Sequence, residues 1–247
     1  MNAITQKEQQ VRPRPAPFPQ DDGSIGDGRP PLNSGDRLSR AEFERRYDAR
    51  PDIKKAELIE GVVYVASPVY PQHGEPHSDI IGWLSVYRAA TPGIRVSDNT
   101  SLRLDADNEP QPDVCVWVDD PTGEALRAPR DSFLEITPDL IVEVAASSAS
   151  YDLHDKLNAY RRNGVQEYLV LLVWEQETRW HTWQEGEYQR LEPGEDGILR
   201  SRVLPGLWLH PERFWAGDLA GVLSVLQRGL ASPEHEAFVR TLRGDDQ

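Results

Sequence analysis

The sequence is almost without cysteine, since Cys115 is the one thiol among 247 residues. A single thiol forms no intramolecular disulfide and supplies no thiolate zinc site, so neither is expected to stabilise this chain. Cys115 lies among valines in an apolar run, where a buried thiol is expected. No apolar run approaches the length of a membrane span, and the first residues lack the hydrophobic core of a signal peptide. These absences predict a soluble cytoplasmic protein.

Basic side chains are also in the minority. The chain has 27 basic and 41 acidic residues and a formal net charge of −14. This balance argues against a protein that coats phosphate backbones non-specifically. It remains compatible with an enzyme that meets nucleic acid through a local basic rim and a bound metal. The region 37–55 contains such a basic concentration, which is either a solvated helix face or a phosphate-facing rim: Arg37, Arg40, Arg45, Arg46, Arg50, Lys54 and Lys55.

Three regions differ in composition. Residues 1–35 are rich in proline and glycine and poor in large apolar side chains, so we expect a disordered tail. Residues 36–216 mix short apolar runs with amphipathic segments and form the expected domain. Residues 217–247 are amphipathic and are expected to form a C-terminal helical extension.

Helix and strand signals alternate within the domain. A first helix is expected over residues 39–48, with Ser39 and Glu42 as a capping box, and a second from about His77 to Ala90. An antiparallel meander precedes a strand–helix–strand crossover, which predicts an α/β or α+β fold with a mixed sheet. The expected strands are 56–59, 62–65, 95–96, 102–104, 113–118, 139–144, 167–174, 178–181, 188–191 and 204–209.

Two of these apolar runs each carry a carboxylate near one end. Asp113 follows Pro112, which cannot donate to a strand ladder and therefore marks a strand edge, and Glu143 lies near the end of its own strand. If the two strands are neighbours, both carboxylates converge, and hard oxygen ligands of this kind suit Mg²⁺ or Mn²⁺. A salt bridge or a capping role is the structural alternative for each residue.

A lysine follows on the next helix, for which Asp152 is the expected N-cap. Lys156 stands four residues after Asp152, so an ordinary helix-surface ion pair is one interpretation. In the other, its stem lies along the apolar helix border and its ammonium reaches the strand ends. There it would orient a water molecule or stabilise charge that develops on a phosphate.

These motifs together resemble the Uma-type putative restriction endonuclease family of the PD-(D/E)XK nuclease superfamily. The resemblance extends over residues 36–215 and implies a restriction-endonuclease-like core, a central mixed sheet flanked by helices. It further implies that Asp113 and Glu143 are catalytic ligands of Mg²⁺ or Mn²⁺, that Glu57 is a further metal ligand, and that Lys156 is the catalytic lysine. The matching segments are 57–62, His77, 111–113, 142–144, 152–156, Tyr160, 164–165, 167–168 and 204–207.

The sequence departs from the family pattern in two places. The superfamily lysine stands two residues after the second acid, where this chain has Ala145. The serine segment 146–150 is one residue shorter than usual and lacks proline, which bears on the reach of Lys156 because one extended residue spans about 3.3–3.6 Å. The expected outer shell of the site consists of His77, Gln111 and Asp152.

Two further patterns point to less specific roles. His73 and His77 have the spacing of zinc ligands on a helix, but Gly74 stands where a zinc protease has glutamate. The four tryptophans of the second half of the domain are expected in the core or covering the sheet, not as platforms for bases: Trp174, Trp180, Trp183 and Trp208.

The leading hypothesis is therefore a metal-dependent endonuclease that acts on nucleic acid, with DNA as the expected partner. The alternative is a nuclease-fold module that binds nucleic acid or a protein partner without cutting, and Ala145 and the net charge motivate it. A structural protein whose acids are all ion-paired is a third interpretation. No membrane association is expected, and a homodimer is one option for the assembly.

Overall fold

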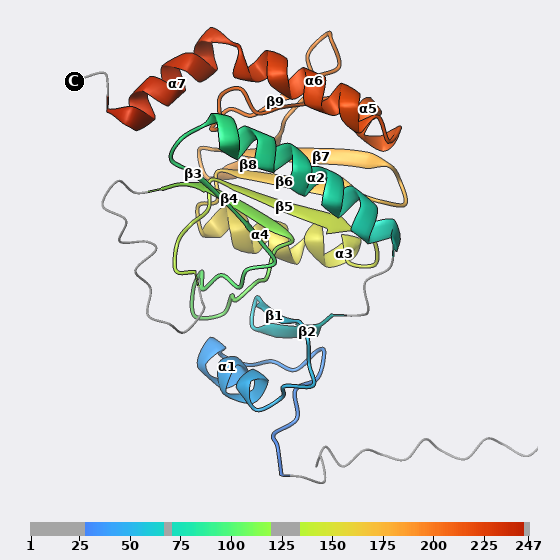
Figure 1. Ribbon diagram of the computed structural model, residues 1–247. Helices are drawn as coiled ribbons and strands as arrows, with labels where there is room; N and C mark the ends of the chain where they lie inside the picture. The colour runs from blue at the N-terminus through green and yellow to red at the C-terminus, as the bar shows by residue number, and fades with distance from the viewer. Residues whose placement is uncertain (1–27, 67–70, 120–133, 245–247) are drawn as a thin grey trace, which may run out of the picture.

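A mixed β-sheet forms the centre of the protein in the computed structural model, which describes residues 28–66, 71–119 and 134–244 (Figure 1). Its six strands run in the order β3-β4-β5-β6-β7-β8. Neighbouring strands are antiparallel except β5 and β6, which are parallel and joined by the crossover through helices α3 and α4. The expected mixed sheet is thus confirmed. Its strands are β3 (Ile94–Asp98), β4 (Val114–Val118), β5 (Leu140–Ala145), β6 (Glu167–Leu172), β7 (Glu177–Gln184) and β8 (Glu187–Arg190).

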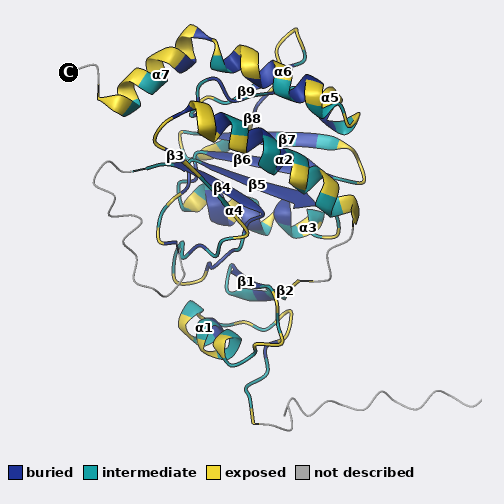
Figure 2. Cartoon of the chain, in the orientation of Figure 1, coloured by how far each residue is buried: buried dark blue, intermediate teal, exposed yellow. Residues whose placement is uncertain are grey.

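Helices cover both faces of the sheet (Figure 1). On one face, Trp83 and Leu84 of α2 (Pro71–Ala90) pack with Val142 and Leu169 of the sheet. On the other, α3 (Ala149–Asp152) and α4 (Asp155–Arg162) pack on residues that include Ile141. Strands β5 and β6 are buried along their whole length, as Figure 2 shows. This double coverage explains why their sequences are unbroken apolar runs and not alternating ones.

A smaller layer of one helix and one β-hairpin lies beside the sheet and brings the carboxylate of Glu57 to it. Helix α1 (Arg40–Asp48) packs on the hairpin β1 (Ala56–Ile59) and β2 (Val62–Val65), whose turn has positive φ at Glu60 and Gly61. The Leu58 N–H donates to the Glu109 carbonyl at 3.1 Å, and the Glu109 N–H donates back at 2.7 Å. These bonds hold the hairpin against the segment that leads into β4.

Residues 28–35, which the composition assigned to a disordered tail, pack against the rest of the protein. Leu32 is 2% exposed and packs with Phe43, and the Gly35 N–H donates to the Val63 carbonyl at 2.8 Å. Residues 28–35 therefore belong to the hairpin layer and not to a disordered tail. The rest of the expected tail, residues 1–27, lies outside the described residues.

Some local expectations were wrong. The Ser39 side chain makes no capping bond, and the Glu42 carboxylate accepts from Arg45 and Arg46, both at 2.7 Å, and not from the Ser39 N–H. Helix α2 begins at Pro71, ahead of the expected start at His77, and continues across Pro76. Of the expected strands, 102–104 makes only an isolated bridge from Leu102 to Leu134, and 204–209 is reduced to β10 (Trp208–Leu209), which pairs with β9 (Leu199–Arg200).

The C-terminal helices lie next to α2 and the end of the sheet that contains β7 (Figure 1). Helix α6 (Leu219–Leu230) contributes Val222 and Leu226 to the same core as the sheet, while α5 (Pro211–Trp215) and α7 (Pro233–Arg243) flank it. Gly229 is what lets α6 approach closely, since a Cβ there would overlap the Gly206 carbonyl. None of the helices in the described ranges is long and apolar enough to cross a membrane.

We expect Gly229→Ala to lower the free energy of unfolding by about 1–3 kcal/mol, because the added methyl forces α6 away from the segment before β10. Gly82→Ala is the matched control, since its Cβ would meet nothing within 4 Å and alanine is favoured over glycine in a helix by about 0.8–1.0 kcal/mol. Urea unfolding of both variants measures the difference. Equal stabilities would contradict the close approach of α6.

Candidate active site

The register of the sheet brings Asp113 and Glu143 together. Asp113 directly precedes β4, whose first residue, Val114, pairs with Val142 of antiparallel β5. One step along this register, Asp113 lies opposite Glu143, and opposite residues of an antiparallel pair project to the same face. The Asp113 carboxylate also accepts from the Val144 N–H at 2.8 Å. Both acids line one pocket of about 750 Å³.

Lys156 completes a buried cluster of charges beneath this pocket. Its ammonium lies 2.8 Å from Glu143 Oε1, 2.9 Å from Glu57 Oε1 and 3.5 Å from Asp152 Oδ1, and the residue is 1% exposed. The Tyr160 hydroxyl donates to the same Glu143 oxygen at 2.9 Å. The short serine segment therefore does not prevent Lys156 from reaching Glu143.

The helix that carries Lys156 is not the one expected. Asp152 is the last residue of the short helix α3, and the chain then turns before α4 begins at Asp155. Asp152 is consequently not an N-cap, and both of its carboxylate oxygens are buried without a hydrogen bond among the described residues. The break between α3 and α4 aims Lys156 at the strand ends.

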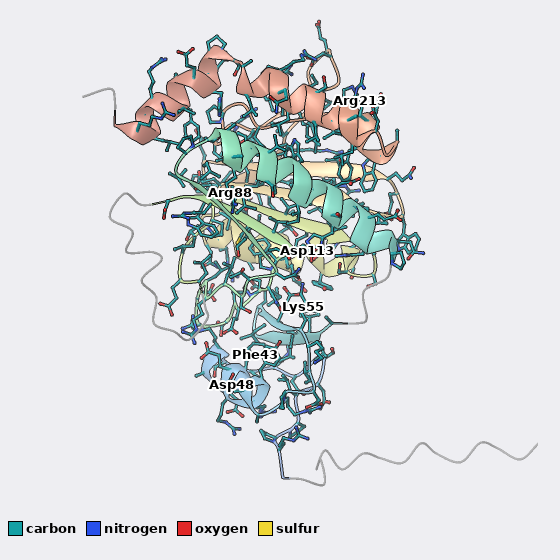
Figure 3. All side chains as sticks on the ribbon, viewed as in Figure 1. Phe43, Asp48, Lys55, Arg88, Asp113 and Arg213 are labelled. Atoms are coloured by element: carbon teal, nitrogen blue, oxygen red, sulfur yellow. The ribbon has the colours of Figure 1, made fainter. Side chains whose placement is uncertain are left out.

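A second set of side chains holds Asp113. His73 Nε2 donates to Asp113 Oδ2 at 3.1 Å, and the Lys55 ammonium lies 3.5 Å from Asp113 Oδ1. Burial alone would raise the pKa of Asp113, but the His73 bond, the Lys55 charge and the Val144 N–H outweigh it and hold that pKa below its usual range. Figure 3 shows Asp113 and Lys55 where the hairpin layer meets the sheet. Asp113 is therefore an ionised carboxylate at the pocket wall.

The Lys156 side of the site is electrostatically different. Burial raises the pKa of Glu143, and the nearby carboxylates add to this shift against the opposing charge of Lys156. Burial would lower the pKa of Lys156, but Glu143, Glu57 and Asp152 raise it well above its ordinary value. Lys156 is therefore a permanent cation, and Glu143 is a carboxyl that keeps its proton more readily than usual.

The charges of the site do not balance. The four carboxylates of Glu57, Asp113, Glu143 and Asp152 face the two ammonium groups of Lys55 and Lys156, so an excess of negative charge remains even when His73, beside Asp113, is protonated. Burying such an excess is costly, and the raised pKa of Glu143 shows one way in which the protein relieves it. Binding a divalent cation would be another.

The residues present fit such a cation. No group of three or more His, Cys, Asp or Glu side chains in the described ranges is arranged to hold a metal by itself. Mg²⁺ does not require one, since it commonly binds one or two carboxylates and keeps water or phosphate oxygens as its other ligands. Asp113 and Glu143 are two carboxylates on one pocket wall, and the hydrogen bonds found for Glu143 both end on Oε1.

The residues expected in the outer shell each contact a member of the site. His77 Nε2 lies 3.3 Å from the Asp113 carbonyl and 3.0 Å from Asp98 Oδ1. The Gln111 N–H donates to Glu57 Oε1 at 2.7 Å. Asp152 faces the Lys156 ammonium, as given above.

The basic residues around α1, in the region 37–55, have two kinds of surroundings. Lys55 lines the pocket, whereas Arg45 and Arg46 pair with Glu42, and Arg50 pairs with Asp52 at 2.8 Å. Lys55 is thus the member of the group that faces the site.

Sequence reasoning missed the role of Trp174. This residue was expected in the core or covering the sheet, but it is 66% exposed and lines the pocket, while Trp180 is buried as expected. Trp174 ends the long apolar run of β6 and precedes two polar residues, Glu175 and Gln176. That boundary position is the only signal that the sequence offered.

Comparison with known proteins identifies a family and a solved structure with the same fold. The Uma2 family, described as "Putative restriction endonuclease", matches residues 40–212. A crystal structure from Anabaena variabilis ATCC 29413, described as "a putative nuclease belonging to DUF820", has the same fold, with a TM-score of 0.52 and 15% identity over 65% of this chain and 89% of that one. No curated protein matches the sequence.

We expect Lys156→Met to lower the free energy of unfolding at pH 8 by about 3–5 kcal/mol, because it leaves buried carboxylates without their cation. The sign of the pH effect follows from Glu143. A folded-state pKa raised from 4.5 to about 8 favours folding at low pH, and this contribution is lost as the pH rises through that range.

The charge of Lys156 lowers the pKa of Glu143, so Lys156→Met raises that pKa further, and the variant loses more stability than wild type as the pH rises. Its deficit relative to wild type should therefore be smaller at pH 5 than at pH 8, as measured by urea unfolding. Lys54→Met, at an exposed position, is the control and should change little. A deficit in the free energy of unfolding that is equal at both pH values would contradict the burial of these carboxylates around Lys156.

Proposed function

Because the chain belongs to the Uma2 family, described as "Putative restriction endonuclease", we propose that it is a metal-dependent endonuclease that hydrolyses phosphodiester bonds of DNA in the cytoplasm. The observation that carries the proposal is the convergence of Asp113, Glu143 and Lys156 on one pocket. Two acids and a lysine next to a cavity are the parts that metal-assisted hydrolysis of a phosphodiester requires.

Asp113 and Glu143 are the residues that would hold Mg²⁺ or Mn²⁺. A bound ion of this kind supplies a water molecule of lowered pKa and polarises the scissile phosphate. The protein contributes the orientation of the two carboxylates. His73 and the Val144 N–H fix Asp113, and Tyr160 fixes Glu143, so neither acid has to reorganise when the substrate arrives.

Lys156 would position the attacking water or stabilise the charge that develops on the phosphate. Its ammonium is held beside Glu143 by Glu57, whose carboxylate is in turn fixed by the Gln111 N–H. In this proposal Glu57 positions Lys156 and, as an outer ligand, adds negative charge beside the metal. Lys55, on the pocket wall, supplies a second positive charge for the phosphate.

One observation favours a different function. The Lys156 ammonium is surrounded by three carboxylates, and Ala145 stands where the superfamily lysine is usual. A protein whose carboxylates stay paired with Lys156 and take up no cation would retain the fold as a binding module that does not cleave. The two functions differ in whether the acids take up a divalent cation.

We expect Asp113→Ala and Glu143→Ala each to reduce Mg²⁺-dependent nicking of supercoiled plasmid DNA at least a hundredfold, because each removes one of two metal ligands. Glu187→Gln, which changes an exposed ion pair with Arg161, is the control and should cleave like wild type. Circular dichroism checks that the variants are folded. Equal nicking by wild type and both alanine variants would refute the assignment of the acids.

A measurement of metal binding distinguishes the proposed endonuclease from a binding module that does not cleave. Calorimetric titration with Mn²⁺ should give a binding isotherm for wild type that is lost in Asp113→Asn, which keeps the shape of the side chain but removes its charge. A wild-type protein that takes up no Mn²⁺ or Mg²⁺ at millimolar concentration would favour the module.

A further inference from the structure

Trp174 occupies an unusual position for an exposed aromatic residue. It is the exposed large hydrophobic residue among those that the structure describes, and it lies just after β6, in the turn that leads to β7. A single exposed apolar side chain needs no explanation by itself. The position of Trp174 does, because its indole forms part of the wall of the pocket that contains Asp113 and Glu143.

The same indole also lines a second pocket of about 400 Å³. Gln72 and Trp174 belong to the walls of both pockets, so the two spaces adjoin along these side chains. The second pocket has an apolar part and a polar part. Its apolar walls are Pro76, Val173, Phe214 and Trp215, and its polar ones include Glu75, Asp79 and Gln176.

The charges of the two pockets select different parts of a nucleotide. In the first pocket, Lys55 and Lys156 together with a cation on Asp113 and Glu143 would offset the carboxylates and stabilise a phosphate. Among the described residues, no lysine or arginine lines the second pocket, and the carboxylates of Glu75 and Asp79 would repel a phosphate there. A nucleobase suits the second pocket better, since it is uncharged, flat and apolar on its faces, and its exocyclic amino groups donate to carboxylates.

We propose that Trp174 stacks on the nucleobase next to the scissile phosphate and directs that base into the second pocket. The inference rests on the proposed function, because it takes the phosphate to lie at Asp113 and Glu143. Base–aromatic stacking is available to every base, so Trp174 contributes affinity and position with little sequence preference. A base on Trp174 has left its own duplex stack, so the substrate carries an unpaired nucleotide at the cleavage position.

The test measures cleavage of a short single-stranded oligodeoxynucleotide by wild type, Trp174→Ala and Trp174→Phe. We expect Trp174→Ala to raise KM by roughly 5- to 140-fold, which is the range that loss of one base stack produces, with a smaller change in kcat. Trp174→Phe retains a ring and should recover most of the loss. Glu175→Gln is the matched control, since this exposed neighbour in the same turn lines neither pocket.

A series of oligonucleotides with one abasic position each locates the stacked base. At one position next to the cleaved bond, removing the base should make wild type and Trp174→Ala equal, because neither then has a stack to lose. Cleavage by wild type with the same KM in Trp174→Ala would overturn the stacking inference and leave the proposed function intact. A wild-type protein that neither binds nor cleaves any of these substrates would overturn the proposed function and the inference with it.

Discussion

The structure depends on one buried ammonium group, that of Lys156. Two carboxylate oxygens lie within 2.9 Å of it, and a third carboxylate stands 3.5 Å away. A charge with almost no exposure to water is tolerated only when its partners are held in place. The rest of the site meets this requirement: the hairpin β1–β2 brings Glu57, strand β5 brings Glu143, and the turn between α3 and α4 aims Lys156 at both.

The same interaction links stability to chemistry. The cluster carries more negative than positive charge when all its groups are ionised, and burial first, then that excess, raises the pKa of Glu143. On the opposite side of the pocket, His73 and Lys55 keep Asp113 ionised. One pocket therefore contains an ionised carboxylate, that of Asp113, and another, that of Glu143, which keeps its proton more readily than usual. A nuclease that uses a divalent metal gains from such an arrangement, because the cation and the phosphate offset each other as they bind.

The sequence predicted those features that local pattern decides. The hairpin at Glu60-Gly61 and the crossover around β5 and β6 follow from turn chemistry and from unbroken apolar runs, and the structure confirms both. The family resemblance implied that Asp113, Glu143 and Lys156 belong to one site, and the register of β4 and β5 and the following helix α4 place all three on one pocket. Local pattern failed as a predictor where tertiary contacts override local preference. The Glu42 carboxylate accepts from two arginines and takes no part in a capping box, and Asp152 ends a short helix and does not cap one. Trp174 looked like a core residue because exposure at a strand end depends on which elements cover it.

Anomalous scattering from crystals soaked in Mn²⁺ shows whether Asp113 and Glu143 hold a divalent cation. We expect one anomalous peak within coordination distance of the carboxylates of Asp113 and Glu143, with Lys156 still beside Glu143. An unchanged cluster without a peak, at a Mn²⁺ concentration that saturates other surface sites, would contradict this expectation.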